Sequence, residues 1–328
     1  MKKIALVTGG NSGEYEISLK TADNIFNMID RTNYEPYLIH LKDNRWTYTH
    51  SNGDVFAINR EDFSLTLDGK KIVFDAVLIA IHGNPGENGR LEGYFDMIGM
   101  PYTGCDMLSS ALTFNKFYCN MVVRALGVPV APSLHYFYGD EIDRKRVAEV
   151  CGYPCFVKSC NSGSSVGVTK VHDESELDAA VQEAFKYDSQ LMIEKMIHGR
   201  EVTCGIGRIN GKVRPLAVTE VVVNTREFYD YTSKYTDGQH DLLTPADIPD
   251  EVRDQIFQYA ELIYRELNCG GIVRIDFFIP SDNQPVFLEV NTIPGQTAMS
   301  IIPQQIRYIG MSLMDVYSQL IEEAFHRR

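Results

Sequence analysis

The stretch Gly271-Ile-Val-Arg-Ile-Asp-Phe-Phe-Ile279, followed by Val286-Phe-Leu-Glu-Val-Asn291, predicts the fold of the C-terminal part of the chain. Apolar and polar residues alternate in both segments, as in strands with one buried face. The connector Pro280-Ser-Asp-Asn-Gln-Pro285 is rich in turn-forming residues, so the two strands are expected to pair as a hairpin.

This hairpin gathers four polar side chains on one surface. Side chains two positions apart on a strand share a face, which puts Arg274 beside Asp276 and Glu289 beside Asn291. Oxygen ligands of this kind suit magnesium that is bound together with substrate phosphates. The alternative is a surface sheet whose polar face is only solvated or salt-bridged. A magnesium site would require phosphate-binding elements elsewhere in the chain.

Length, composition and charge narrow the class of protein. The chain has 328 residues, 44% of them hydrophobic, enough for two or three domains with their own cores. Its formal net charge is −13, and it lacks a long tract of Lys and Arg. Nucleic-acid binding and docking on an anionic membrane are therefore not expected, and a small-molecule substrate fits better.

Two features predict a cytoplasmic protein. The N-terminal apolar run after Lys2 and Lys3 is too short for the core of a signal peptide. The seven cysteines are an odd number, lie mostly in apolar contexts and lack paired Cys-x-x-Cys spacing, so reduced thiols are expected.

The first hundred residues are expected to form an α/β domain with a parallel sheet. A helix is predicted from Glu14 to Asn27, after a glycine turn that lacks the spacing of a dinucleotide-binding fingerprint. The expected strands of this domain are Ile4–Val7, Tyr37–Leu41 and Ala76–Ile81. The whole chain is predicted to be a mixed α/β protein with three domains, at residues 1–104, 105–195 and 196–328.

The middle of the chain supplies a candidate phosphate-binding loop. A helix is predicted from Thr113 to Gly127, with Lys116 in its first turn. The segment from Lys158 to Gly167 is rich in serine and glycine, so its backbone N–H groups can approach phosphate oxygens closely. Unlike a P-loop, it lies between two predicted strands, Pro154–Lys158 and Val166–Val171, and the alternative is an ordinary hairpin with a surface lysine.

Four more elements are predicted in the second half. Strand Gln190–Glu194 leads to a hairpin centred on Asn210-Gly211, the strongest short turn signal in the chain. Residues 224–247 are polar, aromatic and without periodicity, as in a lid loop. A helix is predicted over Asp250–Asn268.

The order of these elements resembles that of the ATP-grasp enzymes, in which ATP lies between a central and a C-terminal domain. Several segments are similar in particular to the D-alanine–D-alanine ligase family, and the similarity runs over nearly the whole chain. These segments are Gly9–Ser18, Ile81–Gly83, Pro101–Gly104, Gly163–Gly167, Phe228–Tyr235 and Glu289–Gly295.

The resemblance implies an ATP-dependent ligase that joins two D-alanine molecules through a D-alanyl phosphate, with a role in peptidoglycan precursor synthesis. It implies a nucleotide site and two Mg²⁺ ions, with Mn²⁺ as an alternative, bound by Asp276, Glu289 and Asn291. The residues implied to bind ATP are Lys116, Lys158, Ser164, Ser165, Glu194, Lys195, Ile197, Glu201 and Lys234.

The substrate roles also rest on the resemblance. Glu14 would bind the ammonium of the first D-alanine, and Ser300 with the Ile301 N–H would bind the carboxylate of the second. Arg274 and the Gly295 N–H would stabilise the oxyanion. His82 would lie near the substrates, with a structural histidine as the alternative.

The lid would complete the site. Lys234 would reach the phosphate, and Tyr235 would hydrogen-bond Ser164 and through it Glu14, while closure excludes water. Tyr235 favours the dipeptide, because ligases that make D-alanyl-D-lactate tend to carry Phe there.

The chain departs from the family pattern at four places, and the alternatives stay open. The departures are Ser159, Cys160-Asn161, Ile293 and Ile301, which affect the expected loop rigidity and substrate affinity. One alternative is another ATP-grasp ligase, such as a D-alanyl-D-lactate ligase. The other is a catalytically idle nucleotide-binding protein, which would usually lack one of the four hairpin residues. The family further implies a homodimer.

Overall fold

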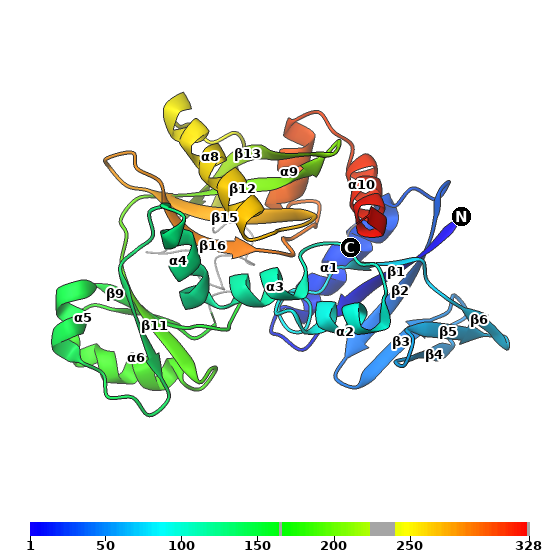
Figure 1. Ribbon diagram of the computed structural model, residues 1–328, viewed down its shortest axis with the longest axis horizontal. Coiled ribbons are helices and arrows are strands. Elements are labelled where there is room, and N and C mark those ends of the chain that lie inside the picture. The colour runs from blue at the N-terminus through cyan, green and yellow to red at the C-terminus, as the bar shows by residue number, and fades with distance from the viewer. Residues whose placement is uncertain (164–165, 224–239, 327–328) are drawn as a thin grey trace.

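The computed structural model describes residues 1–163, 166–223 and 240–326, which form three β-sheets with helices packed against them (Figure 1). None of the helices in these ranges combines the length and the apolar character needed to cross a membrane.

The first sheet is parallel at its centre. Strand β1 (Lys2–Gly9) pairs in parallel with β2 (Tyr34–Lys42) and β7 (Ala76–Ile79), as predicted. Beyond β2 an antiparallel arm extends the sheet to the order β6-β5-β4-β3-β2-β1-β7. The strands of the arm are β3 (Arg45–Thr49), β4 (Val55–Asn59), β5 (Ser64–Leu67) and β6 (Lys70–Ile72). This arm was not predicted, because strands of three to five residues are too short to show a periodicity.

Helices from both ends of the chain cover one face of this sheet. Helix α1 (Tyr15–Met28) follows β1 as predicted, and α10 (Leu313–His326) packs beside it. Side chains from α1, α10, β1 and β7 share one apolar cluster. Figure 1 accordingly shows the C-terminal helix, in red, against the blue N-terminal sheet.

The second sheet is small and antiparallel, with the order β10-β9-β11-β8. Its three predicted strands, including the edge strand β10, are confirmed, whereas the other edge strand, β8, and the short helix α5 were not predicted. The elements are β8 (Ser133–Phe137), α5 (Arg144–Val150), β9 (Cys155–Ser159), β10 (Val168–Val171), the short 3₁₀ helix η1 (Glu174–Glu176), α6 (Leu177–Ala184) and β11 (Gln190–Lys195).

Three helices link the first sheet to the second. They are α2 (Arg90–Ile98), α3 (Met107–Phe114) and α4 (Lys116–Ala125). The predicted helix at 113–127 is α4, which begins at Lys116 because Asn115 caps its N-terminus by accepting a hydrogen bond from the Tyr118 N–H.

The third sheet is antiparallel and carries the predicted hairpin. Its order is β14-β13-β12-β15-β16, with β12 (Arg200–Ile209), β13 (Lys212–Val223), β14 (His240–Leu243), β15 (Ile272–Ile279) and β16 (Val286–Asn291). The turn from β12 to β13 has positive φ at Asn210 (51°) and Gly211 (75°), as the sequence predicts. Strand β14 lies inside the stretch predicted as a loop, at its C-terminal end.

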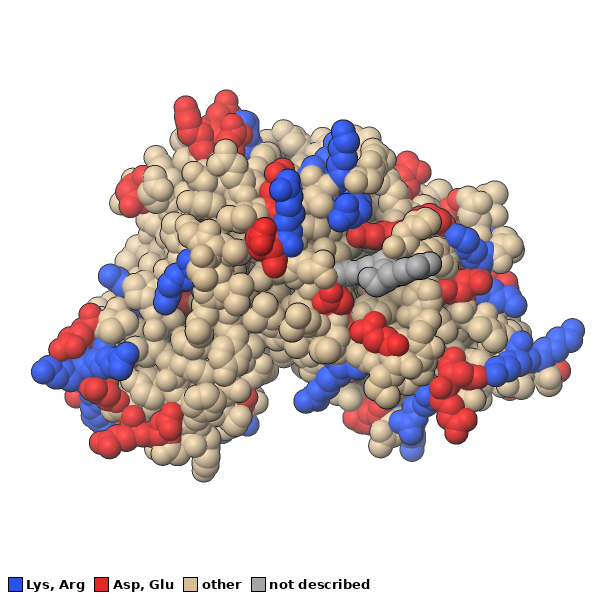
Figure 2. Space-filling view, viewed as in Figure 1, with Lys and Arg blue, Asp and Glu red and all other residues tan. Residues whose placement is uncertain are grey.

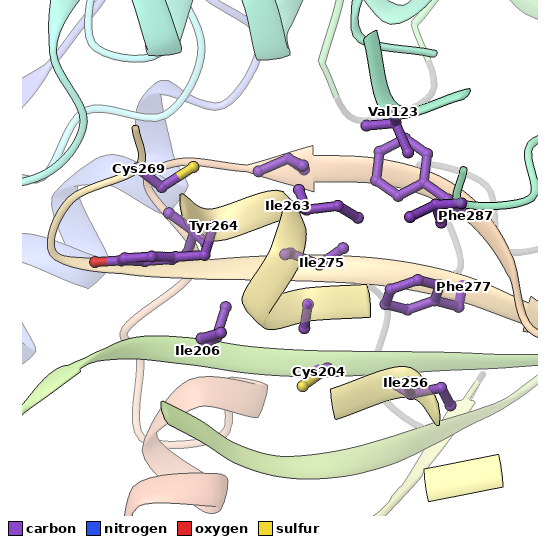
Figure 3. Close-up of a cluster of buried hydrophobic side chains, with 14 of the residues drawn as sticks. Val123, Cys204, Ile206, Ile256, Ile263, Tyr264, Cys269, Ile275, Phe277 and Phe287 are labelled. Atoms are coloured by element: carbon purple, nitrogen blue, oxygen red, sulfur yellow. The ribbon is translucent and has the colours of Figure 1, made fainter. Parts of the chain in front are cut away.

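The alternation predicted for β15 is confirmed by its burial. Val273, Ile275 and Phe277 are fully buried, and they pack with residues of α4 and of α8 (Asp250–Glu266) in one apolar cluster (Figure 3). Full burial of such side chains contributes about 1.5–3 kcal/mol each, so this core fixes which face of β15 points away from α8. Helix α9 (Ile301–Tyr308) packs over β12 and β13.

Candidate functional site

The candidate site is a pocket on the polar face of the third sheet. It is closed on one side by the first sheet's loops and on another by α3, α4 and the serine-rich loop. Of the predicted site residues, those that line it are Glu14, His82, Lys116, Glu201, Arg274, Asp276, Glu289, Asn291, Gly295, Ser300 and Ile301.

The four polar residues of the hairpin lie in register. Arg274 is opposite Asn291, and Asp276 is opposite Glu289, so all four side chains fall on adjacent strands and one face. Asp276 is the centre of this group. Its carboxylate accepts hydrogen bonds from Arg274 Nε (2.9 Å), Asn291 Nδ2 (3.1 Å) and Thr203 Oγ1 (2.5 Å).

The oxygen atoms of this face suit a magnesium ion that shares its coordination with a phosphate-bearing substrate. Two carboxylates and one amide are too few ligands for a closed protein cage, and magnesium usually completes its shell with water and phosphate oxygens. Within the described ranges, no cluster of three or more His, Cys, Asp or Glu residues that could bind a metal occurs.

Two predicted phosphate lysines are held by different partners. Lys116, the first residue of α4, donates through Nζ to the carbonyl oxygen of Ser162 and lines the pocket. Lys158, on β9, forms a buried ion pair with Glu194 on β11. Asn120 on α4 donates to the other oxygen of Glu194 at 3.0 Å.

Apart from Glu201, the predicted adenine-binding residues do not line this pocket, and neither does the predicted phosphate ligand Lys158. Among the described residues, Lys158, Glu194, Lys195 and Ile197 belong to the second sheet or directly follow it and do not line the pocket. Ser164, Ser165, Lys234 and Tyr235 lie outside the described residues.

The turn formed by residues 292–300, which we call the acceptor turn, is hydrogen-bonded to helix α1. Asn24 donates to the carbonyl oxygen of Gln296 at 2.6 Å, and the Gln296 N–H donates to Thr21 Oγ1 at 3.4 Å. Ser300 is the N-cap of α9 and Ile301 its first residue, and both line the pocket, so the positive end of the helix dipole lies at its wall. This geometry favours a bound carboxylate.

The ring of His82 is fixed by its neighbours. Its Nε2 lies 2.9 Å from Thr21 Oγ1, and its backbone N–H donates to Ser18 Oγ. Burial lowers the pKa of His82, so the ring is neutral near pH 7. His82 therefore has the bonding expected of a structural histidine, and it also lines the pocket.

Glu87 is a pocket residue that the sequence analysis missed. One of its carboxyl oxygens accepts a hydrogen bond from the Gly83 N–H (2.6 Å) and the other from the Ile293 N–H (3.3 Å). Gly83 lies in the first third of the chain and Ile293 in the last third. Burial and the nearby charge of Glu14 raise the pKa of Glu87 to about 8. The only signal in the sequence is an acid shortly after His82-Gly83, and it does not reveal a contact with residue 293.

The comparisons with known proteins cover the chain from end to end. Residues 3–105 match the family model for the D-ala D-ala ligase N-terminus, and residues 122–322 match the one for the C-terminus. A D-alanine–D-alanine ligase of Parabacteroides distasonis is 45% identical over 327 residues, which are 100% of this chain and 98% of the relative.

Solved structures agree with this assignment. A D-Ala:D-Ser ligase of Enterococcus faecalis superposes with a TM-score of 0.88 at 33% identity, over 98% of this chain and 99% of the other. The D-alanyl-alanine synthetase A of Vibrio cholerae gives a TM-score of 0.90 at 28% identity, over 99% of both chains. With its three sheets and the polar face of β15 and β16 in register, the chain has the ATP-grasp fold and belongs to the D-alanine–D-alanine ligase family.

Proposed function

We propose that this protein is an ATP-dependent ligase that joins two molecules of D-alanine into D-alanyl-D-alanine and so supplies a precursor of peptidoglycan. The single observation that carries this proposal is the meeting of Glu14, Lys116, Arg274, Asp276 and Ser300 in one pocket of a chain from this family. These groups provide, in one place, a carboxylate that can accept from an ammonium, cationic donors for a phosphate, and a site for a carboxylate.

The first step is phosphorylation of one D-alanine. A carboxylate is a poor electrophile, and transfer of the γ-phosphoryl group of ATP to it creates an acyl phosphate with a good leaving group. Lys116 and Lys158 would contact the phosphates, while Glu194, Glu201 and the backbone at 195–197 would hold the adenosine. The Ser164-Ser165 segment and Lys234 are proposed to join them.

Asp276, Glu289 and Asn291 would hold Mg²⁺, or Mn²⁺, against the phosphates. The metal, when bound, offsets the negative charge of the transferring phosphoryl group. The support for this assignment is the register of Asp276 with Glu289 and the presence of Asn291 at 3.1 Å from the Asp276 carboxylate.

The second step is attack by the amine of the other D-alanine. Glu14 would bind the ammonium of the first substrate, and Ser300 with the Ile301 N–H would bind the carboxylate of the second. The attack forms the C–N bond and a tetrahedral oxyanion, which Arg274 and the Gly295 N–H would stabilise before phosphate leaves. His82 would limit the space around the first substrate.

The lid is proposed to protect the acyl phosphate from water. Residues 224–247 would cover the pocket, with Tyr235 hydrogen-bonded to Ser164. We propose domain boundaries at 104/105 and 195/196, a cytoplasmic location, and no nucleic-acid or membrane partner.

A homodimer is proposed as well. Exposed apolar side chains gather on α2 and α3, where Met97 (86%) and Leu108 (70%) are largely exposed. Figure 2 shows a largely uncharged area left of the centre of this face, with acidic side chains on its right. A molar mass of twice 37.1 kDa by light scattering would support this proposal.

The function is tested by ADP release and product identification. We expect ADP release that requires both D-alanine and Mg²⁺, and D-alanyl-D-alanine as the product. Preferred formation of D-alanyl-D-lactate with D-lactate present would support the ester-forming alternative. Nucleotide binding without ADP release under any substrate would instead support the idle nucleotide-binding protein.

A further inference from the structure

The N-terminus of α4 is joined residue by residue to the base of the serine-rich loop. The Lys116 N–H donates to the carbonyl oxygen of Cys160 at 3.0 Å, and Lys116 Nζ donates to that of Ser162. Between these two contacts, Asn115 Nδ2 donates to Asn161 Oδ1 at 3.1 Å. Three successive loop residues are thus bound by two successive residues at the start of one helix.

Asn115 uses both ends of its side-chain amide in this arrangement. Its Oδ1 accepts from the Tyr118 N–H at 3.1 Å and so caps α4, while its Nδ2 also reaches Gln190 Oε1 at 3.2 Å. The residue is only 5% exposed. Capping requires only the side-chain oxygen, so the NH₂ group is available to bind Asn161 and Gln190 at the base of the loop.

Asp188 holds the loop from the opposite side. A single oxygen, Oδ2, accepts from both the backbone N–H and the Nδ2 of Asn161, each at 2.8 Å. Asn161 is therefore fixed between Asn115 on the helix and Asp188 just before β11. We call Asn115, Asn161 and Asp188 the loop clasp.

The clasp determines where the next loop residues lie. Ser162 and Gly163 line the pocket beside Lys116. Gly163 approaches Glu14 so closely that a Cβ atom at position 163 would lie 2.7 Å from Glu14 Oε2. A displaced loop base would therefore disturb both the lysine and the carboxylate.

We propose that Asn115 is a positioning residue for the reaction: through the clasp it holds Lys116 and residues 158–163 as one unit against the nucleotide phosphates. The proposal deepens the proposed function and rests on it. It also accounts for a departure from the family pattern, because uncharged Asn161 is fixed here by two neighbours where a more charged pair is usual.

Two variants test the clasp from its two sides. Asn115→Ser keeps an oxygen that can cap α4 but is too short to reach the loop, and Asn161→Ala removes the loop's acceptor and its donor to Asp188. For either variant we expect the Kd and the KM for Mg·ATP to rise about fivefold to tenfold, with kcat at saturating ATP within about twofold. The double variant should add little to the larger single effect, since both substitutions break the same link.

Matched controls separate the clasp from general effects. Asp143→Ser makes the same kind of exchange at the cap of α5, whose Asp143 accepts from the Arg146 N–H, without touching the loop. Asn52→Ala removes an amide that donates to Asp54 at 2.8 Å on the distant arm of the first sheet. Both controls should leave the Kd for nucleotide unchanged.

The outcomes are distinguishable. An unchanged Kd for nucleotide in Asn115→Ser and Asn161→Ala overturns the clasp, and so does an equal rise in the Asp143→Ser control. Because binding is measured directly, this result is obtained whether or not the wild-type protein ligates D-alanine. Failure of ligation in the wild type bears on the proposed function instead.

Discussion

The polar face of β15 and β16 and the wall around Glu87 border the same pocket, yet they are assembled in opposite ways. On the face, Arg274 and Asp276 are two residues apart, and Asn291 follows 15 residues after Asp276. In the wall, Glu87 binds Gly83 nearby and Ile293, which is 206 residues away. The face depends on one hairpin, whereas the wall depends on the packing of the first sheet's loops against the acceptor turn.

This difference separates two kinds of residue. In the proposed function the face brings charged groups to the reacting atoms, so substitutions there should lower the rate of the reaction while leaving the fold intact. The wall links Gly83 to Ile293 through Glu87, next to the residues proposed to bind the two substrates, so substitutions there should weaken substrate binding. Variants of each region sharpen or break this distinction.

The largest effect is expected for Arg274→Ala. Loss of the cation that is proposed to stabilise the oxyanion should lower kcat by about a hundredfold to a thousandfold, the range found when one oxyanion donor is removed. Dipeptide formation, with circular dichroism as a check on folding, measures this. Arg253→Ala is a matched control, because Arg253 pairs with Asp250 and Asp254 on the exposed surface of α8. Undiminished turnover in Arg274→Ala would refute the role of the polar face.

An intermediate effect is expected for Glu87→Ala. The Gly83 and Ile293 N–H groups would lose their buried acceptor, and kcat/KM for D-alanine should fall about tenfold to a hundredfold, mostly through KM. Glu87→Gln keeps one acceptor and should lose less. Glu176→Ala is the control. Like Glu87, Glu176 accepts a hydrogen bond from the backbone N–H four residues before it, here that of His172, but it does not line the pocket. A drop in kcat without a change in KM would contradict a wall that only positions substrate.

The smallest effect, a change in thermal stability, is expected for Glu92→Gln. Glu92 is a buried residue of α2 and does not line the pocket. Glu92 is 2% exposed, its Oε2 has no hydrogen-bond partner among the described residues, and burial raises its pKa well above the usual 4.5. A carboxyl whose folded-state pKa is raised stabilises the fold fully below pH 4.5, and this contribution is lost as the pH rises toward the folded-state value.

The neutral amide avoids that loss. Glu92→Gln should therefore raise the Tm by about 2–4 °C at pH 8, with the difference shrinking toward zero near pH 4.5. Thermal unfolding across this pH range measures it, and Glu149→Gln on the surface of α5 should show no such trend. A Tm difference that is independent of pH would mean that Glu92 is ionised in the fold.

The sequence predicted the elements whose pattern is local. The hairpin of β15 and β16, the turn at Asn210-Gly211 and the parallel strands of the first sheet follow from periodicity and turn chemistry. Helix α3, directly before the predicted helix, was missed, because a segment of eight residues with few polar positions shows no clear amphipathic pattern. The arm β3–β6 was missed for a similar reason.

The part of the candidate site that was predicted consists of residues in sequence motifs or in segments that resemble the family. Lys116 is at the start of its helix as expected, and eleven of the predicted residues line one pocket. Glu87 and the clasp residue Asn115 were not predicted as site residues. Glu87 accepts a hydrogen bond from Ile293, and Asn115 donates one to Asn161. The sequence next to Glu87 or Asn115 contains no signal that predicts these distant partners.

By itself the sequence determined which side chains share a face of a strand, because the two-residue repeat of the backbone fixes this before any packing occurs. Only the tertiary structure decided which loops meet: the acceptor turn lies on α1, Glu87 joins residues 83 and 293, and Asn115 joins α4 to the loop. Such contacts depend on how separate apolar cores pack together, and that arrangement is a property of the whole chain.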